Sequence, residues 1–302
     1  MVNKNLYDVI IIGGSYAGLS AAMALGRSMR KVLIIDSGKP CNRQTPHSHN
    51  FITNDGETPA AIAQKAREQV LKYPTVQVIT DTAHTGNKTA SGFEISTTTG
   101  DTFNTRKIIF ATGVLDIMPG IKGFAECWGI TVLHCPYCHG YEVKDKTLGI
   151  IANGDMAFEM CKLIHHWSKK LTLFCNGRAT LNDEQSQQLK YRQIEIVENE
   201  IEELVHNNGY VEQIAFKDGS FQNVAAIYSK VAFEQSSKMP ASLGCAMSEQ
   251  GFIQIDALQK TTISGVYSAG DCTTMMRSVA YAVGMGMVAG AMVNKELIDE
   301  TF

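Results

Sequence analysis

The stretch Tyr7–Asp36, YDVIIIGGSYAGLSAAMALGRSMRKVLIID, decides the fold. Residues 9–12 form a short apolar run suited to a strand buried on both faces, and the turn GGSYAG follows immediately. A helical pattern leads to a second apolar strand at residues 31–35, which ends on Asp36. This order predicts a turn that brings backbone N–H groups and a helix N-terminus to a pyrophosphate, while the terminal acid accepts bonds from an adenosine ribose.

A glycine-rich turn alone is a weak signal, but here the strands, the helix and the acid all fall at the offsets of a dinucleotide-binding fingerprint. One position departs from it, because Ser15 stands where the fingerprint has its second glycine and leaves less room for the backbone to approach a ligand. The candidate cofactor contacts of this unit are Gly13, Gly14, Ser15, Ala17, Gly18, Asp36 and Ser37.

A second informative stretch is HCPYCH at residues 134–139, which holds two thiols at a spacing that lets one disulfide open and close. The thiolate is the reactive species, and the partial charge at a helix start lowers a thiol pKa. His134 precedes Cys135 and His139 follows Cys138, so either imidazole can hold or relay the proton that leaves a thiol. These four residues are the candidate catalytic set.

Three other readings of the same stretch are weaker. A structural zinc site needs four ligands, and the chain has no second C-x-x-C. The pattern C-x-x-C-H also matches c-type haem attachment, which requires export, and the N-terminus has no leader pattern. Buried, inert cysteines are the commonest alternative, but the nucleotide-binding pattern supplies a partner for redox chemistry. We therefore expect no metal.

Composition limits the class of protein. The 302 residues, 44% of them hydrophobic, can form two domains with real cores, and a net charge of −3 gives no general reason to bind nucleic acid or membranes. The eight cysteines form no framework of paired spacings, so we expect a reducing cytoplasm. The longest uncharged apolar run, 278–294, falls short of the ~20 residues that span a bilayer and is predicted to be a buried helix.

The intervening segments give coarser predictions. The polar stretch 40–50 is interpreted as a solvated or cofactor-contacting loop, because His47 and His49 lack further nearby metal ligands; Asn50 is its candidate contact. A helical pattern runs from Pro59 to Tyr73, and alternating segments between 76 and 110 predict an antiparallel insert. A buried strand at 108–110 then runs into the small-residue turn Ala111, Thr112 and Gly113, which are also candidate cofactor contacts.

Residues 146–174 repeat the pattern of the first unit, with a strand at 146–151, a turn at 152–157, a helix at 158–167 and a strand at 171–174. Several positions of this second unit lack the residues that bind a dinucleotide in the fingerprint. Ala152 replaces the first glycine, Asn153 adds a side chain to the turn, and Asp155 brings a negative charge towards any phosphate. The second strand is followed by CNG, which offers neither an acid for a ribose hydroxyl nor a basic cluster for a ribose phosphate.

The closing segment returns to the first domain. Residues 265–271 predict a strand that ends in an acid. In the long apolar helix, Gly284, Gly286 and Gly290 permit close approach of a neighbouring backbone or a cofactor. The candidate cofactor contacts here are Gly270, Asp271, Arg277, Ser278 and Val279.

Together these motifs resemble the low-molecular-weight thioredoxin reductase family over essentially the whole chain. The resemblance rests on the glycine turn with Asp36, the ATG segment at 111–113, the C-x-x-C, and the AGD segment at 269–271. It implies that the first motif binds FAD, that Asp271 contacts the ribityl chain, and that residues 277–279 lie along the isoalloxazine. It also implies that Cys138 faces the flavin, that Cys135 exchanges with substrate, and that the protein is a homodimer whose middle domain swings.

Two departures accompany the resemblance. The family carries an aspartate directly after the second cysteine and a basic cluster after the second strand of the middle domain, whereas this chain has His139 and CNG. Both changes, together with His134 and the HSHN loop at 47–50, resemble the dithiol oxidases, which share the fold and pass electrons from a substrate dithiol through the flavin to oxygen.

We therefore predict an α/β protein with two Rossmann-like three-layer dinucleotide-binding domains, the second inserted in the first. Residues 1–115 and 240–302 form the FAD-binding domain, and 116–239 form a middle domain with the C-x-x-C and a degenerate NAD(P) fold. The predicted function is FAD-dependent thiol/disulfide exchange with weak or absent use of NADPH, in a cytoplasmic homodimer. The partner is a thioredoxin-like protein or a small dithiol or disulfide. The alternatives are a dithiol oxidase and a flavin redox sensor without turnover.

Overall fold

The computed structural model describes residues 6–302. The chain divides into two compact units. Unit 1 comprises the residues through Arg43, Phe51–Leu115 and Phe233–Phe302, and unit 2 comprises Gln44–Asn50 and Asp116–Ala232. The second boundary therefore falls at 232/233 rather than at the expected 239/240. Residues 44–50 group with unit 2, which the sequence did not indicate.

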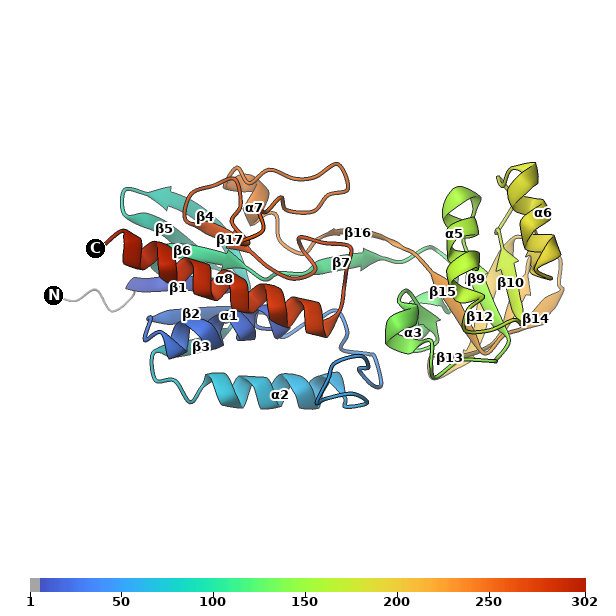
Figure 1. The fold of residues 1–302 in the computed structure, drawn as a ribbon, viewed down its shortest axis with the longest axis horizontal. Helices are drawn as coiled ribbons and strands as arrows, with labels where there is room; N and C mark the ends of the chain where they lie inside the picture. Colours follow the sequence, from blue (N-terminus) through green and yellow to red (C-terminus); the bar gives the residue numbers. More distant parts are fainter. Residues whose placement is uncertain (1–5) are drawn as a thin grey trace. The chain divides into compact units, whose positions relative to one another are not determined.

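Unit 1 is built on a seven-stranded sheet in the order β3-β2-β1-β6-β5-β4, with β17 paired to β6 (Figure 1). Its parallel strands are β1 (Leu6–Ile12), β2 (Val32–Asp36), β3 (Val76–Thr80), β6 (Thr102–Phe110) and β17 (Val266–Ser268). The antiparallel strands β4 (Ala83–Thr89) and β5 (Gly92–Thr97) complete it. The expected antiparallel insert is therefore confirmed for β4 and β5, whereas β3 belongs to the parallel part of the sheet.

The helices of unit 1 are α1 (Tyr16–Arg27), α2 (Pro59–Val70), the short α7 (Met239–Ser242) and α8 (Val279–Asp299). Helix α2 begins with Thr58, whose hydroxyl accepts the Ala61 N–H, and with Pro59 in the first turn. It ends at Val70 rather than at the expected Tyr73, because Pro74 disfavours helical backbone at the residue before it.

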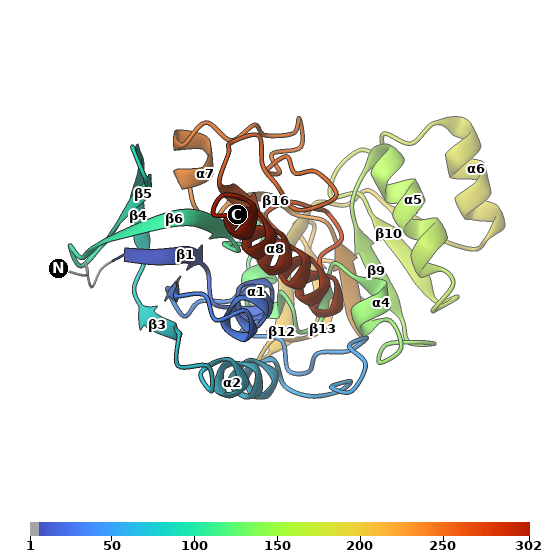
Figure 2. The same ribbon diagram turned by 60° about the vertical axis from the view of Figure 1, so that its left-hand side comes forward.

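Helices α1 and α8 lie side by side against the sheet (Figure 1, Figure 2). A Cβ atom at Gly286 would lie 2.1 Å from the Ala17 carbonyl oxygen, and one at Gly290 would lie 2.6 Å from that of Ala21. These two glycines therefore allow backbone-to-backbone contact. A Cβ at Gly284 would meet no described atom within 4 Å, so no neighbouring backbone approaches that glycine.

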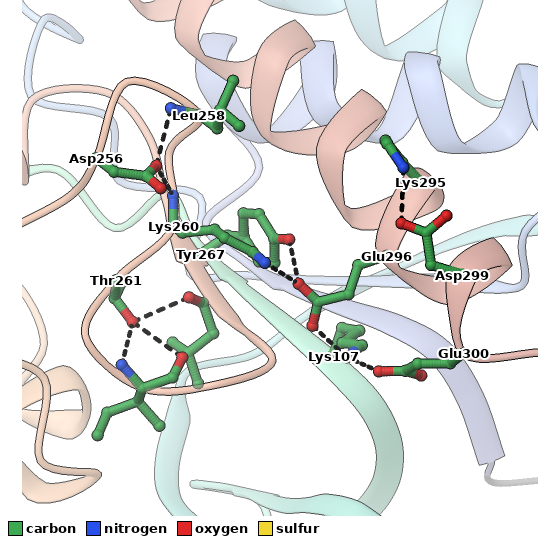
Figure 3. Close-up of polar contacts among 12 residues, drawn as sticks. Lys107, Asp256, Leu258, Lys260, Thr261, Tyr267, Lys295, Glu296, Asp299 and Glu300 are labelled. Carbon is green, nitrogen blue, oxygen red and sulfur yellow. Dashed lines mark hydrogen bonds and ion pairs between the residues drawn. The ribbon is translucent and has the colours of Figure 1, made fainter.

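A polar cluster fastens the C-terminal half of α8 to the sheet (Figure 3). Glu296 accepts hydrogen bonds from Lys107 Nζ at 2.5 Å, Lys260 Nζ at 2.6 Å and the Tyr267 hydroxyl at 2.6 Å. Lys107, which lies on β6, also contacts Glu300 and is only 4% exposed. A buried ammonium needs such carboxylate partners, because an unpaired charge in the core is costly.

Unit 2 contains a parallel five-stranded sheet in the order β11-β10-β9-β15-β8 and an antiparallel sheet β12-β13-β14. The parallel strands are β8 (Val132–Leu133), β9 (Leu148–Ile151), β10 (Leu171–Phe174), β11 (Glu195–Val197) and β15 (Ala226–Ser229). The antiparallel strands are β12 (Ile201–Asn207), β13 (Tyr210–Phe216) and β14 (Phe221–Asn223), and the helices are α3 (Phe124–Cys127), α4 (Pro136–His139), α5 (Gly154–Ile164) and α6 (Asp183–Tyr191). The segments that include the boundaries 115/116 and 232/233 pair as a two-stranded sheet, β7 (Val114–Ile117) with β16 (Ala232–Gln235).

The predicted α/β class with two Rossmann-like units is therefore confirmed. Within residues 6–302, no helix combines the length and the apolar character that crossing a membrane requires.

Candidate active site

Four predicted segments of unit 1 meet at one edge of its sheet. The glycine turn follows β1, Asp36 ends β2, Ala111 follows β6, and Gly270 comes shortly after β17. These strands are parallel and adjacent, so their carboxyl ends lie together. In open α/β sheets this edge is where ligands bind.

The glycine turn is close-packed against its neighbours. Gly13 has φ +104°, and a Cβ there would lie 2.2 Å from the Ala111 carbonyl oxygen. A Cβ at Gly18 would lie 1.9 Å from the Gly13 carbonyl oxygen. Larger residues would push β1, β6 and α1 apart, so the glycines keep the turn at the strand ends. Ser15 is the N-cap of α1 with extended backbone and makes no side-chain capping bond, so it is accommodated where the fingerprint has glycine.

Asp36 closes the turn from the β2 side. Its Oδ1 accepts the Gly14 N–H at 3.0 Å, and a Cβ at Gly14 would lie 2.8 Å from the Asp36 Cβ. One carboxylate oxygen thus fixes the turn, whereas Oδ2 accepts no hydrogen bond from residues 6–302 and can take a hydroxyl from a bound ribose.

The start of α8 is the second polar part of this edge. Ser278 is the N-cap of the 21-residue helix, and its hydroxyl accepts the Tyr281 N–H at 3.2 Å. The Asp271 carboxylate lies 3.4 Å from Arg277 Nε, and the Cys41 thiol lies 3.8 Å from the same carboxylate oxygen. A long helix N-terminus beside a cation is suited to a ligand with electron-rich oxygens.

Most of the predicted cofactor contacts therefore belong to one unit and gather at its strand ends. Ser37 lies one residue past β2 with an exposed side chain, and Asn50 groups with unit 2 rather than unit 1. The residues present fit a dinucleotide, because the turn and the carboxylate of Asp36 form a cradle that any side chain at Gly13 or Gly14 would fill.

In unit 2, a disulfide joins Cys135 and Cys138, whose Cα atoms are 5.3 Å apart. Cys135 is the N-cap of α4, which is a single turn from Pro136 to His139. The expected helix start is confirmed, but one turn carries only a small part of the charge of a long helix. The two histidines that flank the cysteine pair are titratable side chains next to the cysteines in sequence.

His134 is held by aromatic stacking. Its ring stacks on Trp128 with the centroids 5.8 Å apart, and Trp128 stacks on Phe124 at 5.9 Å. The Trp128 indole N–H also donates to the Asp116 carboxylate at 3.1 Å. These contacts fix the ring that precedes Cys135.

His139 has a different environment. Its ring stands edge-on to that of His49 with the centroids 6.3 Å apart, and His49 Nε2 lies 3.6 Å from the Glu142 carboxylate. Burial and the nearby His49 charge lower the pKa of His139 below its usual value, while Glu142 opposes the shift. At neutral pH the His139 imidazole is therefore largely neutral.

The turn of the second dinucleotide pattern is filled by its own side chain. Asn153 Oδ1 accepts the Gly154 N–H at 2.9 Å and the Thr180 N–H at 2.8 Å, and Nδ2 donates to the Arg178 carbonyl at 2.9 Å. Helix α5 starts at Gly154, not at the expected Phe158, because this side chain caps it. The first N–H group that would face a phosphate is already bonded.

Sequence reasoning missed Glu142, Trp128 and Trp167 as neighbours of the redox stretch. Trp167 packs edge-on against Tyr137 at 5.6 Å, and its indole lies where a Cβ at Gly140 would be. Trp167 lies on a segment remote in sequence from Tyr137 and Gly140, whereas Glu142 and Trp128 lie close to the histidines but belong to no motif that would mark them.

The comparisons with known proteins agree with this architecture. A family model described as pyridine nucleotide-disulphide oxidoreductase matches residues 7–286. The thioredoxin reductase tcpT of Claviceps purpurea is 32% identical, with 99% of this chain and 97% of the relative aligned.

Among solved structures, an oxidoreductase from Agrobacterium tumefaciens is 34% identical with a TM-score of 0.91, covering 97% of this chain and 99% of that one. Thioredoxin reductase from Streptococcus pyogenes, at 23% identity, shares the fold with a TM-score of 0.90 over 99% of this chain and all of its own. This chain therefore belongs to the pyridine nucleotide-disulphide oxidoreductase family and is a flavin-dependent disulfide oxidoreductase of the thioredoxin reductase type.

Proposed function

We propose that unit 1 binds FAD and that Cys135 and Cys138 exchange an electron pair between this flavin and an external dithiol or disulfide, with NADPH as a poor donor. The partner is a thioredoxin-like protein or a small dithiol. The relative named thioredoxin reductase supports the former. We further propose a cytoplasmic homodimer, as in the family that the sequence resembles.

Binding of FAD is supported by the cradle at the strand ends. The glycine turn and the α1 N-terminus are suited to the pyrophosphate, and Asp36 Oδ2 to the adenosine ribose. Asp271 and the start of α8 are suited to the ribityl chain and the ring. When bound, the flavin supplies the two-electron chemistry that side chains lack.

Exchange at the disulfide requires a thiolate and a place for its proton. Either sulfur leaves as a thiolate when the bond opens, and the proton from an attacking thiol needs a base nearby. His139 is the neutral imidazole directly after Cys138, whereas His134 is fixed by stacking before Cys135. We assign the substrate-facing role to Cys135 and the flavin-facing role to Cys138, as the family resemblance implies.

The single observation that carries the poor use of NADPH is the bonding of Asn153. Its amide occupies the Gly154 N–H, and the Asp155 carboxylate adds a negative charge in the first turn of α5. No basic cluster follows β10, where Arg178 is the nearest cation in sequence. Each missing charge-assisted bond removes about 1.5–3 kcal/mol, so two of them weaken binding by roughly two to four orders of magnitude.

Anaerobic titration of the yellow protein tests the proposal. We expect dithiothreitol to bleach the flavin band readily, whereas NADPH and NADH bleach it slowly or at high concentration. Rapid, saturable bleaching at micromolar NADPH would overturn the donor assignment and indicate an ordinary NADPH-dependent reductase. Protein that stays colourless after addition of FAD would overturn the cofactor assignment.

A dithiol oxidase is the second candidate, and the state of His139 favours it. Oxidation of a dithiol releases protons and needs a base, whereas reduction of a disulfide needs an acid. The lowered pKa of His139, caused first by burial and then by His49, leaves it as the base at neutral pH. Steady-state oxygen consumption with a dithiol would support the oxidase, and its absence alongside flavin bleaching would support a reductase or a sensor without turnover.

A further inference from the structure

The loop at residues 44–50 is anchored in unit 2 beside the redox stretch. The Gln44 side-chain amide donates to the Trp128 carbonyl, and Ser48 is buried with 7% of its surface exposed. These two residues hold the loop on both sides of Thr45–His47, so the His49 ring is presented to the turn that follows α4. There it lies against His139 and Glu142.

The opposite side of this contact is also fixed. A Cβ at Gly140 would lie 2.4 Å from the Pro136 carbonyl oxygen and 2.6 Å from Trp167 Nε1. The backbone at Gly140, between His139 and Glu142, is therefore closely packed. The His49 ring contacts the side chains on both sides of this glycine, His139 and Glu142.

We propose that Glu142 and His49 are positioning residues that set the protonation of His139 during thiol/disulfide exchange. The inference rests on the proposed function, in which His139 is the base beside Cys138. Glu142 binds His49 when His49 is protonated and stabilises the imidazolium of His139. His49 has the opposite effect on the same ring.

The charges around His139 support this division of roles. The titratable groups that act on it are His49 from the loop and Glu142 from the turn after α4. His49 is 20% exposed and Glu142 is 40% exposed, so solvent screens the pair only partly. At 3.6 Å the contact is too long for a good hydrogen bond and becomes an ion pair when His49 is protonated.

The exchange step needs no reagent other than the substrate thiol, because its proton and the electron pair of the disulfide are both accounted for. A substrate thiol loses its proton to the neutral His139 imidazole, and its sulfur attacks Cys135 Sγ. The Cys135–Cys138 bond breaks, a mixed disulfide forms, and Cys138 leaves as the thiolate with the electron pair of the broken bond. An imidazolium now stands beside a thiolate, and Glu142 offsets the repulsion that His49 adds.

The test uses the FAD-loaded full chain and four variants. Glu142→Gln removes the charge and keeps the size, Glu142→Asp restores the charge, and His49→Gln removes the opposing cation. Glu184→Gln is the matched control, because it removes the same charge from the same unit on α6, where the side chain accepts from Gln188. The pKa of His139 is read by NMR from its ring Cε1 resonance, and exchange is followed by anaerobic flavin bleaching with dithiothreitol across pH.

We expect Glu142→Gln to lower the pKa of His139, to move the rising limb of the rate profile to lower pH, and to reduce the plateau rate about twofold to fivefold. His49→Gln should move both the pKa and the limb to higher pH, and Glu142→Asp should return part of the wild-type profile. A structural role would move neither the resonance nor the limb.

Different results would overturn the proposed function and the positioning role of Glu142. Wild-type flavin that dithiothreitol does not bleach at any pH would overturn the proposed function. Wild-type bleaching with Glu142→Gln and Glu184→Gln giving the same pKa of His139 and the same pH profile would overturn the positioning role alone.

Discussion

Replacing Glu296 with glutamine is expected to lower the free energy of unfolding by about 3 kcal/mol at neutral pH. Glu296 lies on α8 and accepts from Lys107, Lys260 and Tyr267, which come from β6, the segment before β17, and β17 itself (Figure 3). Its side chain is 17% exposed, so solvent screens these contacts little. Glutamine keeps the size and one acceptor oxygen but removes the charge.

The magnitude follows from the pKa of Glu296. Burial acts to raise it, but hydrogen bonds from Lys107, Lys260 and Tyr267 outweigh burial and lower the pKa from 4.5 to about 2. Each unit corresponds to about 1.4 kcal/mol. A folded-state pKa below the unfolded value stabilises the protein above pH 4.5, and this contribution is lost as the pH falls from 4.5 through about 2.

Thermal unfolding at fixed protein and FAD concentration measures the effect, because bound cofactor itself shifts Tm. We expect Tm to fall by roughly 5–10 °C in Glu296→Gln at neutral pH, and the difference from wild type to shrink in acid. Asp299→Asn is the matched control, since it removes an exposed charge paired with Lys295 on the same helix (Figure 3). Its expected cost is below about 0.5 kcal/mol. Equal Tm values for the two variants would refute the reasoning.

Three further predictions concern the cofactor and the thiols. Cys135→Ser should leave a Cys138 thiolate beside the flavin and give a long-wavelength charge-transfer absorption, whereas Cys138→Ser should not; a band in the Cys138 variant alone would reverse the two roles. Gly13→Ala should abolish copurification of FAD, because its Cβ would lie 2.2 Å from a carbonyl oxygen, while Gly120→Ala, with no described atom within 4 Å, should retain the yellow colour. Asn153→Gly should tighten NADPH binding about tenfold in a fluorescence titration by releasing one N–H for a phosphate, and unchanged binding would show that the Asn153 amide is not the obstacle.

The cofactor edge of unit 1 could be predicted from the sequence because its requirements are local. The turn needs glycine at position 13 because the Ala111 carbonyl lies against it, and at position 18 because the Gly13 carbonyl does. The acid that closes the turn must come at the end of the next strand. Spacing alone therefore predicts the positions. The sequence indicated that Asn153 adds a side chain to the second turn, but it did not indicate that this side chain caps the helix, so the start of α5 was missed.

The surroundings of the histidines could not be predicted in this way. His49 and Glu142 are separated by 93 positions in the chain, and neither belongs to a periodic pattern. Their contact depends on residues 44–50 packing with unit 2, which no local propensity requires. The same holds for Lys107 and Glu296, which meet only because α8 crosses β6. Such contacts are formed by tertiary packing, so they can be identified only from the folded structure.

The glycine contacts also bear on which substitutions the chain can tolerate in the course of evolution. At Gly14 an added methyl group would lie 2.8 Å from the Asp36 Cβ, so glycine at position 36 could make room, with loss of the ribose contact. At Gly286 the obstacle is the backbone carbonyl of Ala17, which every amino acid carries. No second substitution at position 17 can make room. Substitution at Gly14 can therefore be compensated by a second substitution at position 36. Substitution at Gly286 cannot be compensated at position 17 while α1 and α8 keep their present spacing.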